Sequence, residues 1–483
     1  MGRALGRPCD HGGVDQVVII GGGPGGYEAA LVASQLGGSV TLVEDQGLGG
    51  SAVLTGTVPS KTLVATADVM TEVRESGELG VRLDASGCAD DDPDHGVAVD
   101  LAAVNARVLD LATTQSADIA ERLRNEHVTI LDGRGRLDGS ERVVATLKDD
   151  TEQQLDADIV LVATGSRPRE LASAPLDGER ILSWRHLYDL PELPERLIVV
   201  GSGVTGAEFA SAYDALGSDV VLVSSRDRVL PGEDADAAQV LEDVFTRRGM
   251  TVMSRSRAAS VARDGDGVLV TLTDGRKVSG SHCLLAVGSI PNTEDLGLET
   301  TRVETDRNGS IVVDRVSRTK ARGVYAAGDC TGVLPLASVA AMQGRIAMWH
   351  ALGDAVSPLD LLTVSSNVFT TPEIATVGVS QQQVDDHVVP AREVVLRLRG
   401  NPRAKMQGNR DGFVKLFCRS VTGIVIGGVV VAPRASELIY PISLAISQRL
   451  TVDQLSASFT VYPSLSGSIA EAARRLHGSR SIT

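Results

Sequence analysis

The residues whose spacing most directly suggests chemistry are two sets of glycines. The first set is Gly21, Gly23 and Gly26, which follow the apolar run 17–20. In such a set the first glycine permits a tight turn, the second lets a pyrophosphate approach the backbone, and the third lets a helix pack on the strand. Glu44 ends the next apolar run and can accept hydrogen bonds from ribose hydroxyls. The combination predicts a dinucleotide site.

The second set is Gly201, Gly203 and Gly206, and it recurs in the same setting. Ser224 follows Gly203 at the same spacing at which Glu44 follows Gly23. A serine hydroxyl therefore replaces the carboxylate of the first set. Two such sets imply two dinucleotides and an internal duplication of the binding unit.

The loss of the second acid bears on the choice of cofactor. An acid at this position binds the ribose of NADH and repels the 2′-phosphate of NADPH. Ser224 removes the repulsion, Ser225 can donate to a phosphate, and Arg226 and Arg228 can offer charge-assisted hydrogen bonds. The alternative is that both arginines point into solvent. On the first interpretation NADPH is used at least as well as NADH.

A carboxylate is also expected at the carboxyl edge of a strand. The run 322–332 ends a strand in Gly328-Asp329, and the run 158–168 ends another in Ala-Thr-Gly. Ligands of parallel sheets bind at this edge. A helix that begins near Leu336 would present the positive end of its dipole to a developing anion.

These residues need strand–turn–helix–strand units to position them. We expect strands at 17–20 and 40–43 around a helix at 25–36, and a second strand and helix at 197–200 and 205–216.

The C-terminal part has a different pattern. Its runs 368–379, 412–419 and 423–432 alternate like strands of a mostly antiparallel sheet, and helical stretches are expected at 434–450 and 466–476. The predicted class is therefore α/β, with two Rossmann-like domains and a C-terminal α+β domain. The predicted divisions are an N-terminal extension at 1–13, a first nucleotide domain at 14–165 and 290–360, a second at 166–289, and an interface domain at 361–483.

Composition excludes several functions. A net charge of -16 over 483 residues argues against a nucleic-acid partner. No apolar run approaches the roughly 20 residues that span a bilayer, and the N-terminus lacks an apolar signal core. The five cysteines form no paired spacing, which fits reduced thiols in the cytoplasm and no metal site. The acidic stretch 84–98 is expected to be a surface loop without chemistry.

Taken together, the segments resemble the flavoprotein disulfide reductases, the family of lipoamide dehydrogenase, glutathione reductase and mercuric reductase, over nearly all of residues 15–475. The resemblance implies that the first site binds FAD and the second binds NAD(P)H. It further implies that Asp329 binds the ribityl chain of the flavin. The C-terminal block should form a homodimer in which each active site uses residues of both subunits.

The resemblance gives two sets of expected cofactor-binding residues. For FAD they are Gly21, Gly23, Pro24, Gly25, Gly26, Glu44, Gly49, Gly50, Ser51, Lys61, Gly135, Ala163, Thr164, Gly165, Gly328, Asp329, Leu336 and Ala337. For NAD(P)H they are Gly201, Gly203, Val204, Thr205, Gly206, Glu208, Ser224, Ser225, Arg226 and Gly288.

The chain departs from this family where the thiol chemistry should be. The family's GGTCxNxGCxPSK stretch reads GGSAVLTGTVPSK at 49–61, with Ala52 and Thr57 in place of the two cysteines. Neither can form a thiolate or a disulfide. The family's terminal acid–base His and Glu are replaced by Tyr462 and Gly467. A phenol with a pKa near ~10 cannot shuttle protons at neutral pH as an imidazole does.

The hydride half of the chemistry is retained. Lys61 and Glu208 match the lysine and glutamate that pair beside the flavin N5 in the family. The alternative is an ordinary exposed ion pair. Tyr462 of the partner subunit would line the acceptor face of the flavin and stack on a flat acceptor, or else it only fills space.

The pattern is most similar to the lipoamide-dehydrogenase-like NAD(P)H:quinone reductases of actinobacteria, which share the cysteine-free stretch and the "VYPSLSGSI" ending. The expected function is hydride transfer from NAD(P)H to FAD and electron transfer to a quinone, without disulfide reduction. Two alternatives remain: a soluble pyridine nucleotide transhydrogenase, and a non-catalytic flavin- or NAD(P)H-binding redox sensor.

Overall fold

The computed structural model describes residues 14–81 and 96–478, which fall into two compact units. Among the described residues, unit 1 consists of 14–54, 113–167 and 290–359, and unit 2 of 55–81, 96–112, 168–289 and 360–478. The expected extension 1–13 and most of the acidic stretch 84–98 lie outside the described residues. No helix among the described residues is long and apolar enough to cross a membrane.

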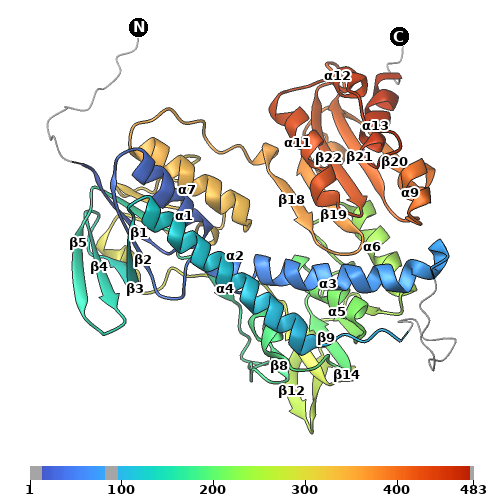
Figure 1. Ribbon diagram of the computed structural model, residues 1–483, viewed down its shortest axis with the longest axis horizontal. Coiled ribbons are helices and arrows are strands. Elements are labelled where there is room, and N and C mark those ends of the chain that lie inside the picture. The colour runs from blue at the N-terminus through green and yellow to red at the C-terminus, as the bar shows by residue number, and fades with distance from the viewer. Residues whose placement is uncertain (1–13, 82–95, 479–483) are drawn as a thin grey trace. The chain divides into compact units, whose positions relative to one another are not determined.

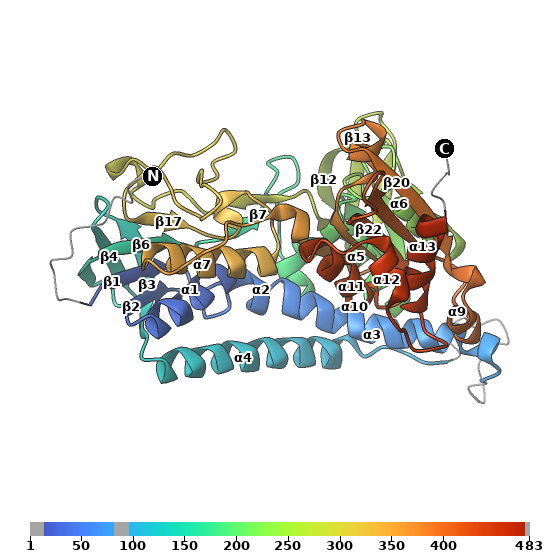
Figure 2. The ribbon, with the colours of Figure 1, turned by 90° about the horizontal axis from the view of Figure 1, so that it is seen from above.

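Unit 1 is built on a seven-stranded sheet in the order β17-β6-β1-β2-β3-β4-β5. Figure 1 labels β1 to β5, and Figure 2 labels β6 and β17. The strands from β17 to β3 pair in parallel, and β3, β4 and β5 pair antiparallel. The β-branched run Val-Val-Ile-Ile of β1 is buried, as expected for the centre of a parallel sheet. The strands are β1 (Gln16–Ile20), β2 (Ser39–Glu44), β3 (Thr129–Leu137), β4 (Arg142–Leu147), β5 (Glu152–Asp156), β6 (Ile159–Val162) and β17 (Val324–Ala326).

Helices α1 (Pro24–Gln35) and α7 (Ala337–Ala351) pack closely on each other, side by side in Figures 1 and 2. A Cβ at Gly344 of α7 would lie 2.0 Å from the Gly25 carbonyl oxygen, so only glycine permits this approach. Proline at the first position of α1 is suited to a helix start, because its missing N–H has no helical partner. The expected helix start near Leu336 is confirmed, since α7 begins directly after it.

Unit 2 contains the repeat of this arrangement. Its parallel sheet has the order β11-β10-β9-β15-β8, and a separate antiparallel sheet has the order β12-β13-β14. The segment β9–α5–β10 reproduces β1–α1–β2, as the duplicated glycine sets predict. The elements are β8 (Ile181–Leu182), β9 (Arg196–Val200), α5 (Val204–Leu216), β10 (Asp219–Val223), α6 (Ala235–Arg247), β11 (Thr251–Met253), β12 (Ala258–Asp264), β13 (Gly267–Leu272), β14 (Lys277–Gly280) and β15 (His282–Leu285).

The C-terminal block, also in unit 2, is an antiparallel sheet in the order β18-β19-β22-β21-β20 with helices around it. Its strands are β18 (Ser365–Val368), β19 (Glu373–Gly378), β20 (Ala391–Arg397), β21 (Phe413–Arg419) and β22 (Val425–Ala432). Its helices are α8 (Gln381–Asp385), α9 (Pro402–Met406), α10 (Ala435–Leu438), α11 (Tyr440–Ser447), α12 (Val452–Ala457) and α13 (Gly467–Gly478). The predicted α/β class with a C-terminal α+β part is confirmed.

Two long helices were not expected from the sequence. Helix α3 (Thr57–Glu75) follows the short α2 (Gly50–Leu54), and α4 (Leu101–Asn125) runs from unit 2 into unit 1. The strands β7 (Ser166–Pro168) and β16 (Ser289–Pro291) pair where the chain passes from one unit to the other. The predicted domain divisions stay a prediction.

Candidate functional site

The first glycine turn leaves one face open. Gly21 has a φ of +103°, and a Cβ there would lie 2.4 Å from the Ala163 carbonyl oxygen. A Cβ at Gly26 would lie 1.8 Å from the Gly21 carbonyl oxygen, so both positions need glycine. By contrast, nothing lies within 4 Å of a Cβ at Gly23. The turn is therefore packed on its inner side and open where a pyrophosphate would approach.

Glu44 is held over this turn by backbone amides. Its Oε2 accepts a hydrogen bond of 2.6 Å from the Gly22 N–H, and its Oε1 accepts one of 2.7 Å from the Gln46 N–H. The side chain is half-buried at the end of β2. The carboxylate is thus fixed next to the open turn, where it can accept from ribose hydroxyls.

The second glycine pair of unit 1 lies against the same turn. The Gly49 N–H donates to the Gly22 carbonyl oxygen at 2.8 Å, and a Cβ at Gly50 would lie 2.9 Å from the Cα of Gly23. Ser51 follows with an exposed side chain. The structure therefore brings these three residues to the open turn.

Asp329 lies after β17 and is bound by a residue that sequence analysis missed. The Ser166 hydroxyl donates to Asp329 Oδ2 at 2.8 Å. Burial raises the pKa of Asp329, and the Ser166 hydrogen bond opposes that rise. A second missed residue, Gln343 of α7, accepts from the Gly328 N–H at 2.9 Å. Ser166 directly follows the Ala-Thr-Gly stretch, and that position was the one available signal.

The remaining expected residues of unit 1 have local partners. The Thr164 hydroxyl donates to the Asn292 carbonyl oxygen at 2.6 Å, and the Gly165 carbonyl accepts from the Asn292 N–H. Gly135 lies on β3, where a Cβ would lie 3.1 Å from the Ile20 side chain and would crowd it, and its expected contact with a cofactor stays a prediction.

The edge of unit 1 fits a flavin dinucleotide. It offers an open turn for the pyrophosphate, the Glu44 carboxylate for a ribose, and the partly buried Asp329 for hydroxyl groups. Helix α7 begins there without a side-chain cap, so its first N–H groups remain available to an acceptor.

The second glycine turn has the same construction. Gly201 has a φ of +115°, and a Cβ there would lie 2.2 Å from the Ala286 carbonyl oxygen. A Cβ at Gly206 would lie 1.8 Å from the Gly201 carbonyl oxygen, and nothing lies within 4 Å of a Cβ at Gly203. Val204 and Thr205 begin helix α5 directly after Gly203, and their side chains are exposed and half-buried, respectively. This turn can therefore receive a second pyrophosphate.

Ser224 does not take the place that Glu44 has in unit 1. It is fully buried, and its hydroxyl lies 2.7 Å from that of Ser202. Ser225 and Arg226 are exposed, whereas Arg228 is half-buried and its guanidinium donates to the Pro231 carbonyl oxygen at 3.5 Å. Gly288 has a φ of +99° and open space around it.

Lys61 and Glu208 form an ion pair inside unit 2, between the adjacent helices α3 and α5 (Figure 1). Lys61 Nζ lies 2.7 Å from Glu208 Oε2, and the glutamate side chain is 6% exposed against 28% for the lysine. The glutamate is therefore buried and the lysine partly exposed, so the pair is more buried than an ordinary surface ion pair. Their expected place beside a flavin stays a prediction.

Tyr462 is 82% exposed and lies in a stretch with the exposed Phe459 and Val461. No hydrogen bond or ring contact joins it to the Lys61–Glu208 pair among the described residues. Its expected role through a partner subunit therefore also stays a prediction.

No described thiol replaces the missing redox pair. Ala52 lies in α2 and Thr57 begins α3. The described cysteines Cys283, Cys330 and Cys418 are all buried. Burial raises the pKa of the Cys330 thiol to about 11 and that of Cys283 higher still, so neither forms a thiolate at neutral pH.

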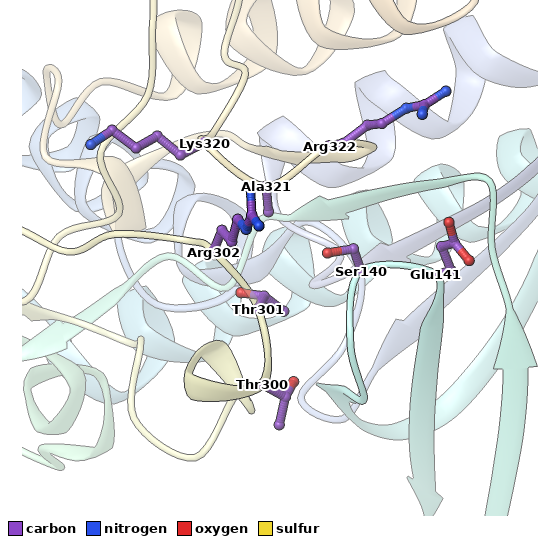
Figure 3. A pocket seen from close by; sticks show the side chains of 8 residues that line it. All are labelled: Ser140, Glu141, Thr300, Thr301, Arg302, Lys320, Ala321 and Arg322. Atoms are coloured by element: carbon purple, nitrogen blue, oxygen red, sulfur yellow. The ribbon is translucent and has the colours of Figure 1, made fainter.

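A pocket of about 460 Å³ in unit 1 lies apart from these residues (Figure 3). Its lining includes Ser140, Thr301 and Arg302 and none of the expected site residues. Figure 3 shows that Lys320 and Arg322 extend away from each other, and Lys320 is paired with Glu304. The basic side chains thus do not converge on a common ligand.

Comparisons with known proteins show the family of this chain. Residues 15–344 match the family described as pyridine nucleotide-disulphide oxidoreductase, and residues 364–473 match the dimerisation domain of that family. The chain belongs to the pyridine nucleotide-disulphide oxidoreductases.

Two curated relatives and one solved structure are similar to the chain over nearly its whole length. The chain is 56% identical to an NAD(P)H dehydrogenase (quinone) of Mycobacterium tuberculosis over 96% of this chain and 94% of that protein. It is 31% identical to a dihydrolipoyl dehydrogenase of Chlamydia muridarum over 94% and 95% of the two chains. The crystal structure of LpdA from Mycobacterium tuberculosis superposes with a TM-score of 0.90 at 55% identity, over 96% of this chain and all of that one.

Proposed function

We propose that this protein is an FAD-dependent NAD(P)H:quinone oxidoreductase without disulfide reductase activity. The observation that carries the proposal is the 56% identity, over nearly the whole chain, to a protein named NAD(P)H dehydrogenase (quinone). The replacement of both redox cysteines by Ala52 and Thr57 supports it, because a family member without that pair needs an external electron acceptor.

Each candidate site has a role in this proposal. The open turn at Gly23 and the Glu44 carboxylate bind FAD, and the open turn at Gly203 binds NAD(P)H. Arg226 and Ser225 contact the 2′-phosphate when NADPH is bound. Lys61, held by Glu208, presents a fixed positive charge and hydrogen-bond donors at the flavin.

The overall reaction balances with one added proton. NAD(P)H, a proton and a quinone give NAD(P)⁺ and a hydroquinone. FAD held by the residues of unit 1 would supply the two-electron carrier between NAD(P)H and the quinone. The positive end of α7 stabilises negative charge that develops nearby.

We further propose that the protein is a homodimer and that Tyr462 of the partner subunit lines the quinone site. A tyrosine ring can stack on a flat quinone while its hydroxyl donates to a quinone oxygen. Its exposure of 82% in a single chain supports a role at an interface rather than in a core. Tyr462→Ala should slow reoxidation by quinone and leave reduction by NAD(P)H unchanged.

The proposal is tested by turnover of the purified holoenzyme with different acceptors. With NADPH as donor, a soluble benzoquinone or naphthoquinone should be reduced rapidly, whereas lipoamide and glutathione disulfide should give only background rates. Reduction of NAD⁺ analogues without quinone turnover would favour a transhydrogenase. Absence of turnover with every acceptor would favour a redox sensor.

A further inference from the structure

The Lys61–Glu208 pair has a third partner, from the C-terminal block. Glu208 Oε1, the oxygen that Lys61 does not contact, accepts a hydrogen bond of 2.8 Å from the backbone N–H of Phe369. The ring of the same residue lies under the ammonium group, with Lys61 Nζ 4.7 Å from the ring centroid. Phe369 thus contacts the acid with its backbone and the base with its ring.

Both contacts restrict motion. Two donors on two different oxygens fix the plane of the Glu208 carboxylate, which is buried and cannot exchange these donors for water. A cation within about 6 Å of a ring centroid is attracted to the ring face. One N–H of the Lys61 ammonium group donates to Glu208, and the ring of Phe369 covers another side of the group. The remaining N–H donor therefore has one preferred orientation.

The segment that carries Phe369 is anchored to the same two helices. The Thr371 N–H donates to the Ser211 hydroxyl of α5 at 3.2 Å, and the Thr371 hydroxyl donates to Asp68 Oδ1 of α3 at 3.2 Å. Arg248 Nη1 donates to the Thr371 carbonyl oxygen at 3.3 Å. Residues 369–371 are therefore hydrogen-bonded, at Phe369 and at Thr371, to the helices that carry Lys61 and Glu208.

From this arrangement we infer that Phe369 is a positioning residue for Lys61, an inference that rests on the proposed function of the pair. The ring and the backbone N–H of Phe369 hold the lysine and glutamate in the orientation in which Lys61 acts at the flavin. Because Phe369 lies in the region that matches the dimerisation domain, the step in which NAD(P)H reduces the flavin depends on that region.

The test compares variants that remove the ring while keeping the backbone N–H. Phe369→Leu and Phe369→Met lack the ring face, and Phe369→Tyr retains it. In anaerobic rapid mixing of the holoenzyme with NADPH, the first two should reduce the flavin roughly 3- to 10-fold more slowly than wild type. Reoxidation by quinone should change less than twofold, and Phe369→Tyr should behave as wild type in both steps.

A second measurement does not require bound flavin or activity. In the apoprotein, the rate at which a small acylating reagent labels Lys61, followed by peptide mass spectrometry, should rise in Phe369→Leu and Phe369→Met and stay unchanged in Phe369→Tyr. Asp68→Asn, whose amide oxygen can still accept from the Thr371 hydroxyl and which leaves the ring in place, is the matched control and should label as wild type.

Wild-type labelling of Lys61 in Phe369→Leu and Phe369→Met, together with wild-type flavin reduction, would overturn the inference. Equal slowing of both half-reactions in these variants would also overturn it, because it indicates general loosening of the structure. If NADPH does not reduce the wild-type flavin at all, the proposed function fails, and the labelling rates still decide whether Phe369 positions Lys61.

Discussion

Ser202 and Ser224 mark the difference between the two nucleotide sites at the residue scale. In the first turn the Gly22 N–H donates to the carboxylate of Glu44. At the same positions of the second turn, the side chains of Ser202 and Ser224 bond to each other and are buried. A carboxylate at 224 would need the space that the Ser202 side chain fills, so both serines must be exchanged to place a carboxylate there.

Exchanging both serines should therefore shift the cofactor preference. In Ser202→Gly/Ser224→Glu, the new carboxylate can accept from the ribose of NADH and repel the 2′-phosphate of NADPH. The ratio of kcat/KM for NADH over NADPH should rise by roughly tenfold, the scale of one charge-assisted hydrogen bond. Ser202→Gly alone is the control and should leave the ratio near that of wild type.

Arg226→Ala tests the cofactor preference independently of the two serines. The exposed guanidinium can reach a 2′-phosphate but has no equivalent target on NADH, so KM should rise for NADPH more than for NADH. An unchanged ratio in the double serine variant, with equal losses for both cofactors in Arg226→Ala, would show that this loop does not select the cofactor.

At the scale of elements, the N-terminus of α6 is joined to β21 by a buried ion network. Lys415 Nζ lies 2.8 Å from Asp234 Oδ2 and 2.7 Å from Asp236 Oδ2. Burial opposes the charge on Lys415, but these hydrogen bonds outweigh it and raise the pKa of the lysine. Asp234 also accepts from the Asp236 and Ala237 N–H groups and so caps α6.

Removing the lysine should destabilise unit 2 strongly. Lys415→Met leaves Asp234, whose side chain is 3% exposed, without its cation. The free energy of unfolding should therefore fall by about 3 kcal/mol. Asp236→Asn is the matched control, because the Asp236 side chain is 61% exposed and its loss should cost below about 1 kcal/mol. Urea denaturation followed by circular dichroism measures both. Equal effects of the two changes would contradict the buried role of Lys415.

His282 at the start of β15 makes stability depend on pH. Its Nε2 lies 2.9 Å from Arg180 Nη1, which can only donate, so the imidazole is neutral and its Nδ1–H donates to the Ser281 hydroxyl at 3.0 Å. Burial, together with the charges of Arg180 and Arg263, lowers the pKa of His282 to about 4.

The sign of the effect follows from this lowered pKa. The unfolded chain takes up a proton near pH ~6.5 and the folded chain near 4, so stability is lost as the pH falls between these values. His282→Asn keeps an acceptor for Arg180 and removes the titration. The melting temperature should fall more between pH 7 and pH 5 in wild type than in His282→Asn. Parallel melting curves for the two proteins would contradict this assignment.

Element boundaries were predictable where local chemistry sets them. Each glycine turn has its strand and helix within about a residue of the expected bounds, because positive φ and close packing leave no other choice at Gly21 and Gly201. Proline explains two differences. The expected helix 434–450 is divided into α10 and α11 next to Pro441. Of the run 368–379, only Val368 lies in β18, and β19 begins directly after Pro372.

Contacts between distant segments could not be predicted from spacing. The Lys61–Glu208 pair was expected only through a family resemblance, since 147 positions separate its members. The Phe369 contact with Glu208 joins positions 161 apart and has no sequence signal, because a backbone N–H can donate from any residue type except proline.

At the scale of the whole molecule, the exposed apolar residues of the C-terminal block predict a dimer. Phe459 is fully exposed, and Val461 and Tyr440 are 77% and 67% exposed. Apolar side chains exposed to this degree are typical of protein–protein interfaces. Sedimentation should give twice the mass of one chain for wild type, and Phe459→Asp should weaken the association. Val421→Asp, at another highly exposed position, is the control; equal masses for all three proteins would argue against an interface at Phe459.

On the proposed function, electrons leave this protein from the flavin and not through a disulfide. Anaerobic rapid mixing with NADPH, followed by mixing with a quinone, tests it most directly. We predict that the flavin absorbance bleaches after two electrons, that no thiolate-to-flavin charge-transfer band develops, and that the quinone restores the oxidised spectrum rapidly. Uptake of four electrons with a charge-transfer band, or a reduced flavin that lipoamide reoxidises faster than quinone does, would contradict it.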